Sequence, residues 1–171
     1  MVVVRASLGL VEIRDASPDD WPRIYPFFAA ITDAGGTYAY PLDHTLESAR
    51  PWWMESPPGV TVVATDAGEI LGSAKMGPNR PGRGAHIATA SFMVDPAHQG
   101  RGIGKALGTY AVEWARAQGY VGMQFNAVVS TNVVAVRLWQ QLGFTIMTTI
   151  PEAFDHRVHG LVGLHVMYQK F

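Results

Sequence analysis

Three glycines occupy alternate positions in the stretch "VDPAHQGRGIGKAL" (94–107), between Pro96 and the start of an apolar helix pattern. A simple strand-to-helix turn needs one glycine or none, so Gly100, Gly102 and Gly104 indicate that a ligand comes close to the backbone. The first amides of a helix lack intrahelical partners, and the helix dipole favours negative charge at that end. The spacing therefore predicts a site for a phosphate or pyrophosphate.

Two common phosphate-binding patterns do not fit this stretch. A P-loop ending at 104–105 would need a glycine and a Ser or Thr where the chain has Gln99 and Ala106. The dinucleotide fingerprint G-x-G-x-x-G would need a glycine in place of Leu107. A third pattern, Q/R-x-x-G-x-G/A, is satisfied by residues 99–104. A glycine-rich turn that binds nothing remains the alternative.

The elements that must position this loop are predicted from periodicity. Apolar–polar alternation and turn residues predict strands over 8–14, 60–76 (two strands about a turn at 66–68), 85–95, 120–129, 144–150 and 159–169. Helical spacing and capping residues predict helices over 17–31, 45–56, 102–119 and 132–143, with Ile103, Leu107, Ala111 and Trp114 on the apolar stripe of the third. The order predicts an α/β fold with a mixed sheet, in which the strands at 85–95 and 120–129 are parallel across a helical crossover.

Composition limits the class of protein. The 171 residues suit a single domain over 1–171, and 48% hydrophobic against 16% charged residues is enough for a packed core. A net charge of −1 offers no basic surface for nucleic acid or membrane. The absence of cysteine excludes disulfides and thiolate metal sites. The N-terminal stretch is too broken for a signal peptide and no apolar run could span a bilayer, so we expect a cytoplasmic protein.

The loop and its surroundings resemble the GCN5-related N-acetyltransferase (GNAT) family. The pattern at 99–104 is that family's pyrophosphate loop, and "SFMVDP" before it is similar to the family's strand end. The segment "STNVVAVRLWQQLGF" (130–144) resembles the family's N-x-x-A-x-x-x-Y-x-x-x-G-F pattern. The resemblance implies a largely antiparallel sheet with a central parallel strand pair that splays for acetyl-CoA.

The same resemblance implies an enzyme, an N-acetyltransferase that moves an acetyl group directly from its co-substrate acetyl-CoA to the amine of a small molecule. The stretches "QFNAVVSTN" and "TTIPEAF" are similar to a subgroup that acts on small cyclic amines or amino-acid analogues. By position, the residues that contact acetyl-CoA would be Phe92, Met93, Val94, Gln99, Gly100, Arg101, Gly102, Ile103, Gly104, Lys105, Asn126, Asn132 and Trp139. An ordinary core strand would explain residues 92–94 equally well, and Asn132 would also serve as a helix N-cap.

One residue departs from the family pattern. Trp139 stands where the family often has a tyrosine that protonates the departing thiolate, and an indole cannot do this. The strands at 85–93 and 121–128 contain no Asp or Glu, so the polar candidates are His86, Thr89, Ser91 and Asn126. His86 lies far up its strand and could simply be at the surface, so the predicted catalytic residues are Thr89, Ser91 and Asn126, and the site is expected to be neutral and polar. Asn126 is unusual inside a strand and needs a polar partner. Either the strand bulges there and backbone groups satisfy the side chain, or the side chain faces the acetyl-CoA cleft, which is the alternative we favour.

The acceptor end is expected to be aromatic. Tyr38, Tyr40 and Phe154 are the candidate substrate-lining residues, although a dimer contact or core packing would also use them. His156 and His159 have a metal-like spacing, but no third ligand is apparent, so no metal site is predicted. A homodimer is compatible with the composition. Two other classes remain open: an acyl-CoA-binding or sensing domain without catalysis, and a scaffold protein.

Overall fold

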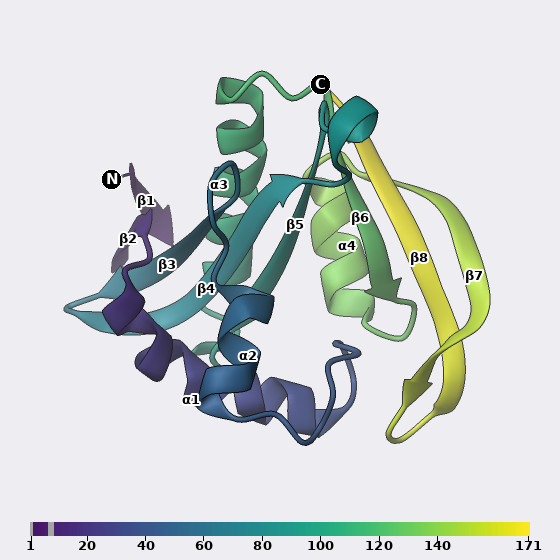
Figure 1. Ribbon diagram of the computed structural model, residues 1–171, viewed down its shortest axis with the longest axis horizontal. Helices are drawn as coiled ribbons and strands as arrows, with labels where there is room; N and C mark the ends of the chain where they lie inside the picture. Colours follow the sequence, from purple (N-terminus) through teal and green to yellow (C-terminus); the bar gives the residue numbers. More distant parts are fainter. Residues whose placement is uncertain (1, 7–8) are drawn as a thin grey trace.

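One eight-stranded sheet organises the computed structural model, which describes residues 2–6 and 9–171 (Figure 1). The strands are β1 (Val2–Ala6), β2 (Gly9–Asp15), β3 (Val60–Asp66), β4 (Glu69–Pro78), β5 (Ile87–Val94), β6 (Gly122–Val129), β7 (Thr145–His156) and β8 (Gly160–Lys170). Their spatial order is β1-β2-β3-β4-β5-β6-β8-β7, and every neighbouring pair is antiparallel except β5 and β6. The predicted mixed sheet with a central parallel pair is confirmed.

Four α-helices pack on this sheet: α1 (Trp21–Ala34), α2 (Leu46–Trp53), α3 (Ile103–Ala117) and α4 (Val133–Gln141). Short 3₁₀ turns lie at Pro18–Asp20, Gly82–Gly84 and Pro96–His98. Figure 1 shows α1 and α2 beside each other and apart from α3 and α4. Side chains of α1 and α2 pack in one buried cluster, with Phe28 and Trp53, and those of α3 and α4 in another, with Leu107 and Trp139. Among the described residues, no helix has the length and apolar character needed to cross a bilayer.

The centre of the sheet opens along its length. β5 and β6 are paired only at Ile87 with Gly122 and at Ala88 with Met123, beyond which the two strands diverge. A register shift in β6 between Phe125 and Val128 marks a bulge at the point of divergence. This is the splay that the family resemblance implied.

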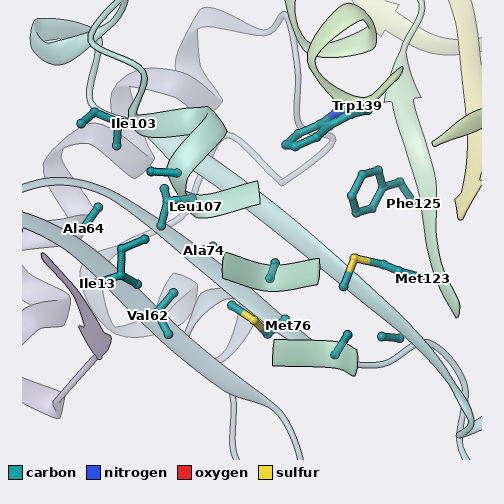
Figure 2. Close-up of a cluster of buried hydrophobic side chains, with 14 of the residues drawn as sticks. Ile13, Val62, Ala64, Ala74, Met76, Ile103, Leu107, Met123, Phe125 and Trp139 are labelled. Carbon is teal, nitrogen blue, oxygen red and sulfur yellow. The ribbon is translucent and has the colours of Figure 1, made fainter. Parts of the chain in front are cut away.

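An aromatic trio fills the space on the α4 side of the divergence. The Trp139 ring lies 4.6 Å from the Phe92 ring of β5 and 5.0 Å from the Phe125 ring of β6, centroid to centroid. Figure 2 shows Trp139 and Phe125 facing each other at one end of the buried cluster. These contacts join the two halves of the sheet where the hydrogen-bond ladder does not.

Several predicted boundaries were wrong. No strand was predicted over 2–6, where β1 pairs with β2, and Leu8, the first residue of the predicted strand 8–14, lies outside the described residues. The first helix begins at Trp21, because residues 18–20 form a 3₁₀ turn capped by Ser17.

β7 continues past Pro151 to His156. It is the edge strand, where a proline costs no ladder bond, and a register shift between Ile150 and Phe154 absorbs the irregularity. On α3, Ala115 rather than Trp114 completes the fully buried stripe, and Trp114 is half-buried.

Candidate active site

A cavity of about 470 Å³ lies at the divergence of β5 and β6. Its walls come from the loop between α1 and α2, from β4, β5 and β6, from α4 and from β7. The predicted site residues that line it are Tyr38, Tyr40, Thr89, Ser91, Phe92, Met93, Val94, Gln99, Asn126, Asn132, Trp139 and Phe154. Residues from distant parts of the sequence therefore meet in one place, as the family resemblance implied.

The β5 edge that faces the divergence has polar backbone groups for a ligand. The Asp95 N–H, just past β5, donates to the Leu71 carbonyl near the start of β4, at 3.0 Å. Because backbone groups alternate along a strand, the N–H and C=O groups of Val94 and Phe92 point the other way, toward diverging β6. Met93 turns its backbone toward β4, and its side chain is buried among the residues around Trp53. Val94 can therefore offer backbone groups to acetyl-CoA, and Met93 contributes packing. Both backbone groups of Phe92 are bonded to the Tyr38 hydroxyl, which a ligand must displace to pair there.

The glycine loop leads from β5 into α3. Gly100 and Gly102 have φ of 78° and 83°, in the left-handed region, and Gly102 is the N-cap of α3. Gly104 differs, because a Cβ there would lie 3.5 Å from Leu138 and 3.7 Å from Val94, which is ordinary contact. The backbone conformation therefore requires glycine at positions 100 and 102. At position 104 the protein leaves enough space for a side-chain Cβ.

The charged residues of the loop are placed differently from each other. The Arg101 guanidinium lies 3.2 Å from an Asp66 carboxylate oxygen and 3.1 Å from His98 Nδ1, so it is held by the protein itself. Lys105 is exposed on the first turn of α3. Ile103 is buried at 1% exposure, so only its backbone amide can face a phosphate. Lys105 is therefore the loop cation better placed to reach a phosphate.

Asn132 and Asn126 both line the cavity. Asn132 Oδ1 accepts from the Ala135 N–H at 3.2 Å, and the same side chain lines the cavity, so capping and cavity lining coincide. Asn126 faces the cavity, which is the favoured alternative, and the strand also bulges there. The Asn126 side chain is exposed and bonds to other side chains: Gln124 Nε2 donates to its Oδ1 at 2.8 Å, and its Nδ2 donates to Asn79 Oδ1 at 2.6 Å.

A second cavity of about 350 Å³ adjoins the first and shares Lys75, Thr89, Ala90, Ser91 and Asn126 with it. Lys75 Nζ lies 3.1 Å from Glu55 Oε1, with the two side chains 22% and 36% exposed. An ion pair of opposite charges therefore lies at the edge of the cavity, in addition to the neutral polar side chains of β5 and β6. Neither Lys75 nor Glu55 lies in the strands predicted at 85–93 and 121–128, which contain the catalytic candidates. Lys75 could have been found from the β4–β5 register, which sets it opposite Ser91, but Glu55 follows α2 and has no local signal.

The aromatic side of the cavity is a stacked set of rings. Tyr38 stacks on Tyr40 at 5.6 Å and Tyr40 stacks on Trp52 at 5.6 Å, between centroids. Burial raises the pKa of Tyr40 to about 12 and raises the pKa of Tyr38 further, so both hydroxyls stay protonated at neutral pH. Phe154, 6% exposed, reaches the cavity from β7. His86, by contrast, is exposed before β5 begins and is not among the lining residues.

Comparison with known proteins places this geometry among acetyltransferases. The model of the acetyltransferase (GNAT) family matches residues 15–144. A GCN5-related N-acetyltransferase from Kribbella flavida is 55% identical in structure comparison, with a TM-score of 0.91 over 94% of this chain and 98% of that one.

Two curated relatives are also similar. The L-methionine sulfoximine/L-methionine sulfone acetyltransferase of Pseudomonas aeruginosa is 35% identical over 149 residues, 82% of this chain and 83% of that protein. The N-acetyltransferase aca1 of Schizosaccharomyces pombe is 35% identical over 103 residues, 60% of this chain but 49% of that protein, so the match spans about half of aca1. The family match reaches across the cavity from α1 to the end of α4, and the chain belongs to the GNAT acetyltransferase family.

Proposed function

We propose that this protein is an acetyl-CoA-dependent N-acetyltransferase that transfers the acetyl group directly to the amine of a small molecule. The observation that carries the proposal is the open edge of β5. It runs from the glycine loop, an anion-binding helix start, to a polar cavity where an acceptor fits. Family membership supports the same reaction class.

In this proposal the two ends of acetyl-CoA meet different elements. The pyrophosphate lies on the backbone amides of residues 100–105, and Lys105 adds a positive charge. The pantetheine arm pairs with the β5 edge at Val94 and Phe92 as an added strand would. The thioester then lies in the cavity beside Ser91, and the acceptor amine attacks its carbonyl carbon.

The acceptor amine must lose a proton during the reaction. Thr89, Ser91 and Asn126 offer hydroxyl and amide groups that can orient the amine or a water molecule. Glu55 is the one carboxylate among the described residues that line the two cavities, so it is the candidate general base. Lys75 holds it in place at the cavity edge.

We propose that the acceptor itself carries a carboxylate as well as an amine. Lys75 can pair with an acceptor carboxylate, and the aromatic wall of Tyr38, Tyr40 and Phe154 suits a short side chain. The Pseudomonas relative is named for L-methionine sulfoximine and L-methionine sulfone, which are amino-acid analogues, and this supports the same class here.

Cofactor binding is the first test. Isothermal calorimetry with acetyl-CoA should show binding by the wild type that Gly102→Glu weakens at least about tenfold, because its carboxylate would lie where a phosphate belongs. Gly119→Glu is the matched control, since Gly119 has the same φ of 83° at the other end of α3 and open space around it. Equal binding by wild type and Gly102→Glu would reject the loop as the pyrophosphate site.

Turnover is the second test. Thiol release should be measured with L-methionine sulfone and with the corresponding amine that lacks the carboxylate. We expect turnover of the first substrate, and Lys75→Met should raise its KM about tenfold or more while leaving KM for acetyl-CoA unchanged. Binding without thiol release across a panel of amines would favour an acyl-CoA sensing domain, a reading that the buried Trp139 at the family's tyrosine position supports.

We further propose a cytoplasmic enzyme that forms a homodimer and has no nucleic-acid partner. The net charge of −1 is unsuited to a phosphate backbone. Met147 and Ile150 are 61% and 49% exposed on β7, the edge strand of the sheet, which supports self-association there. Sedimentation velocity of the wild type and of Ile150→Lys tests the dimer.

A further inference from the structure

We propose that the Tyr38 hydroxyl is a catalytic group, which donates a hydrogen bond to the thioester carbonyl oxygen beside the Phe92 N–H and stabilises the oxyanion that forms there. This inference rests on the proposed function. Tyr38 was predicted only as a residue that lines the acceptor site.

The first argument is the position of the hydroxyl oxygen. The Phe92 N–H donates to Tyr38 Oη at 2.9 Å, and Tyr38 O–H donates to the Phe92 carbonyl at 2.6 Å. One hydroxyl therefore satisfies both polar groups of a residue on the open edge of β5. An oxygen atom already lies where a carbonyl oxygen would accept from the Phe92 N–H. A thioester oxygen that accepts from the Phe92 N–H must therefore lie next to the Tyr38 hydroxyl.

The second argument is that packing holds the Tyr38 ring at the cavity, so that its hydroxyl stays beside the Phe92 N–H. The Tyr38 ring stacks on Tyr40 and meets the Trp53 ring edge-on at 6.1 Å. The loop that carries it is anchored at its start, where the Arg157 N–H donates to the Gly35 carbonyl at 3.0 Å. In the proposal, the incoming oxygen takes over the Phe92 N–H, and rotation about the Cζ–Oη bond turns the Tyr38 proton from the Phe92 carbonyl to that oxygen.

The third argument is protonation. Burial raises the pKa of Tyr38, with Tyr40 beside it acting in the same direction. A phenol in this environment stays neutral and keeps its proton at the pH of an enzyme assay. It is therefore suited to donate a hydrogen bond to developing negative charge and unsuited to act as a base.

The chemical step balances without any further reactant. The amine nitrogen bonds to the carbonyl carbon, and the C=O electron pair moves to the oxygen, which accepts from Tyr38 O–H and the Phe92 N–H. Collapse of this intermediate restores the C=O bond and breaks the C–S bond. Glu55 takes the proton that the amine loses, and the proton then passes through water to the departing thiolate. The products are therefore the amide and free coenzyme A, and Glu55 is again a carboxylate.

The test compares Tyr38→Phe with Tyr25→Phe. Tyr25 is a matched control, because its hydroxyl bonds to His44 Nδ1 at 3.2 Å in the same aromatic cluster but does not line either cavity. We expect Tyr38→Phe to lower kcat by roughly 10²–10³-fold, as loss of an oxyanion donor does, with the Kd for acetyl-CoA within about threefold of wild type. Tyr25→Phe should keep kcat within about threefold. An unchanged kcat in Tyr38→Phe, with or without tighter binding of acetyl-CoA, would overturn the proposal. The hydroxyl would then only satisfy the backbone groups of Phe92 when no ligand is bound.

A second readout does not depend on turnover. The carbonyl stretch of acetyl-CoA labelled with carbon-13 at the thioester should shift to lower frequency on binding, and Tyr38→Phe should lose part of that shift while Tyr25→Phe keeps it. If the wild type binds acetyl-CoA but turns over no amine, the proposed function fails while the infrared shift still decides the hydroxyl contact. An identical shift in wild type and Tyr38→Phe would reject that contact, and failure of the wild type to bind acetyl-CoA would overturn both proposals.

Discussion

At the scale of single residues, Trp139 packs between two strands but cannot supply the acidic hydroxyl that a tyrosine would. It is 7% exposed and lies between Phe92 of β5 and Phe125 of β6. A large apolar ring closes the gap left by the splayed strands on the α4 side, a role that a smaller, polar tyrosine would fill less well. The hydroxyl that the family often carries at this position is absent, and the structure instead brings the Tyr38 hydroxyl to the cavity from the other face of the sheet.

Asp20 is the residue whose ionisation contributes most clearly to stability. Its carboxylate accepts two bonds from the Arg14 guanidinium, at 2.7 and 2.9 Å, and one from the Ser17 N–H at 2.8 Å. The Arg14 hydrogen bonds hold the pKa of Asp20 at about 2, below its ordinary value of 3.8. Because the folded-state pKa is lowered, the stabilisation is complete above pH 4 and is lost as the pH falls from about 4 to about 2.

We therefore expect Asp20→Asn to reduce the free energy of unfolding by about 2 kcal/mol at pH 7 and to flatten its dependence on pH between 4 and 2. Urea unfolding followed by circular dichroism across pH 2–7 measures both quantities. Asp19→Asn is the control, because Asp19 is exposed and should change stability by less than about 0.5 kcal/mol. An acid limb as steep in Asp20→Asn as in the wild type would contradict the assignment.

At the scale of elements, the single helix α3 meets three other parts of the fold. Its N-terminus continues directly from the glycine loop, its buried residues pack on the sheet, and its second turn contacts α4. Gly108 allows this last contact, because a Cβ there would lie 2.7 Å from Leu142 and 2.8 Å from Trp139. The two helices approach as closely as they do because no side chain separates them at this point.

Two glycine-to-alanine substitutions on α3 should therefore have opposite effects. Gly104→Ala should raise the free energy of unfolding by up to about 1 kcal/mol, since its Cβ meets only ordinary contacts and alanine favours the helix. It should keep acetyl-CoA affinity within about threefold, because the loop pattern accepts alanine there. Gly108→Ala should lower stability by about 1–3 kcal/mol through overpacking. Urea unfolding compares the two, and equal effects would show that α3 and α4 adjust their separation freely.

At the scale of the whole molecule, the sheet is two halves joined by few hydrogen bonds. β5 and β6 share two register pairs, and the rest of the junction is the packing of Trp139 with Phe92 and Phe125. On the other face of the sheet, the Tyr38 hydroxyl makes hydrogen bonds with both backbone polar groups of Phe92 at this edge of β5. A ligand that pairs with β5 within this gap should stabilise the entire fold, because it bridges the weakest line of the sheet.

We expect saturating acetyl-CoA, at about 100 times its Kd, to stabilise the protein by about 2.7 kcal/mol and to raise Tm by roughly 5–10 °C. Differential scanning calorimetry at several acetyl-CoA concentrations measures the shift, which should grow with the logarithm of concentration. Gly119→Glu should show the wild-type shift and Gly102→Glu should show little. A shift retained in Gly102→Glu would place the stabilising site elsewhere on the molecule.

Much of the cofactor end of the site is encoded locally, so it could be predicted from the sequence. The glycine loop, the helix that follows it and the capping Asn132 depend on backbone conformation and short spacings, which neighbouring residues decide. The parallel crossover of β5 and β6 follows from the order of elements. Local patterns failed at edges, at β1 and at the extended β7, because pairing partners far along the chain decide where an edge strand begins and ends.

The acceptor end was decided by tertiary structure alone. Glu55 reaches Lys75 from a loop 20 residues away, and the Tyr38 hydroxyl reaches Phe92 across 54 residues. Such contacts depend on how α1 and α2 pack on the sheet and on where their connecting loop runs, which no spacing in the sequence specifies. Local sequence patterns specify a fold with a strand edge and a helix start that acetyl-CoA can use. Only the packing of distant segments decided which charged and hydroxyl groups meet the acetyl group there, because side-chain proximity is a property of the folded chain.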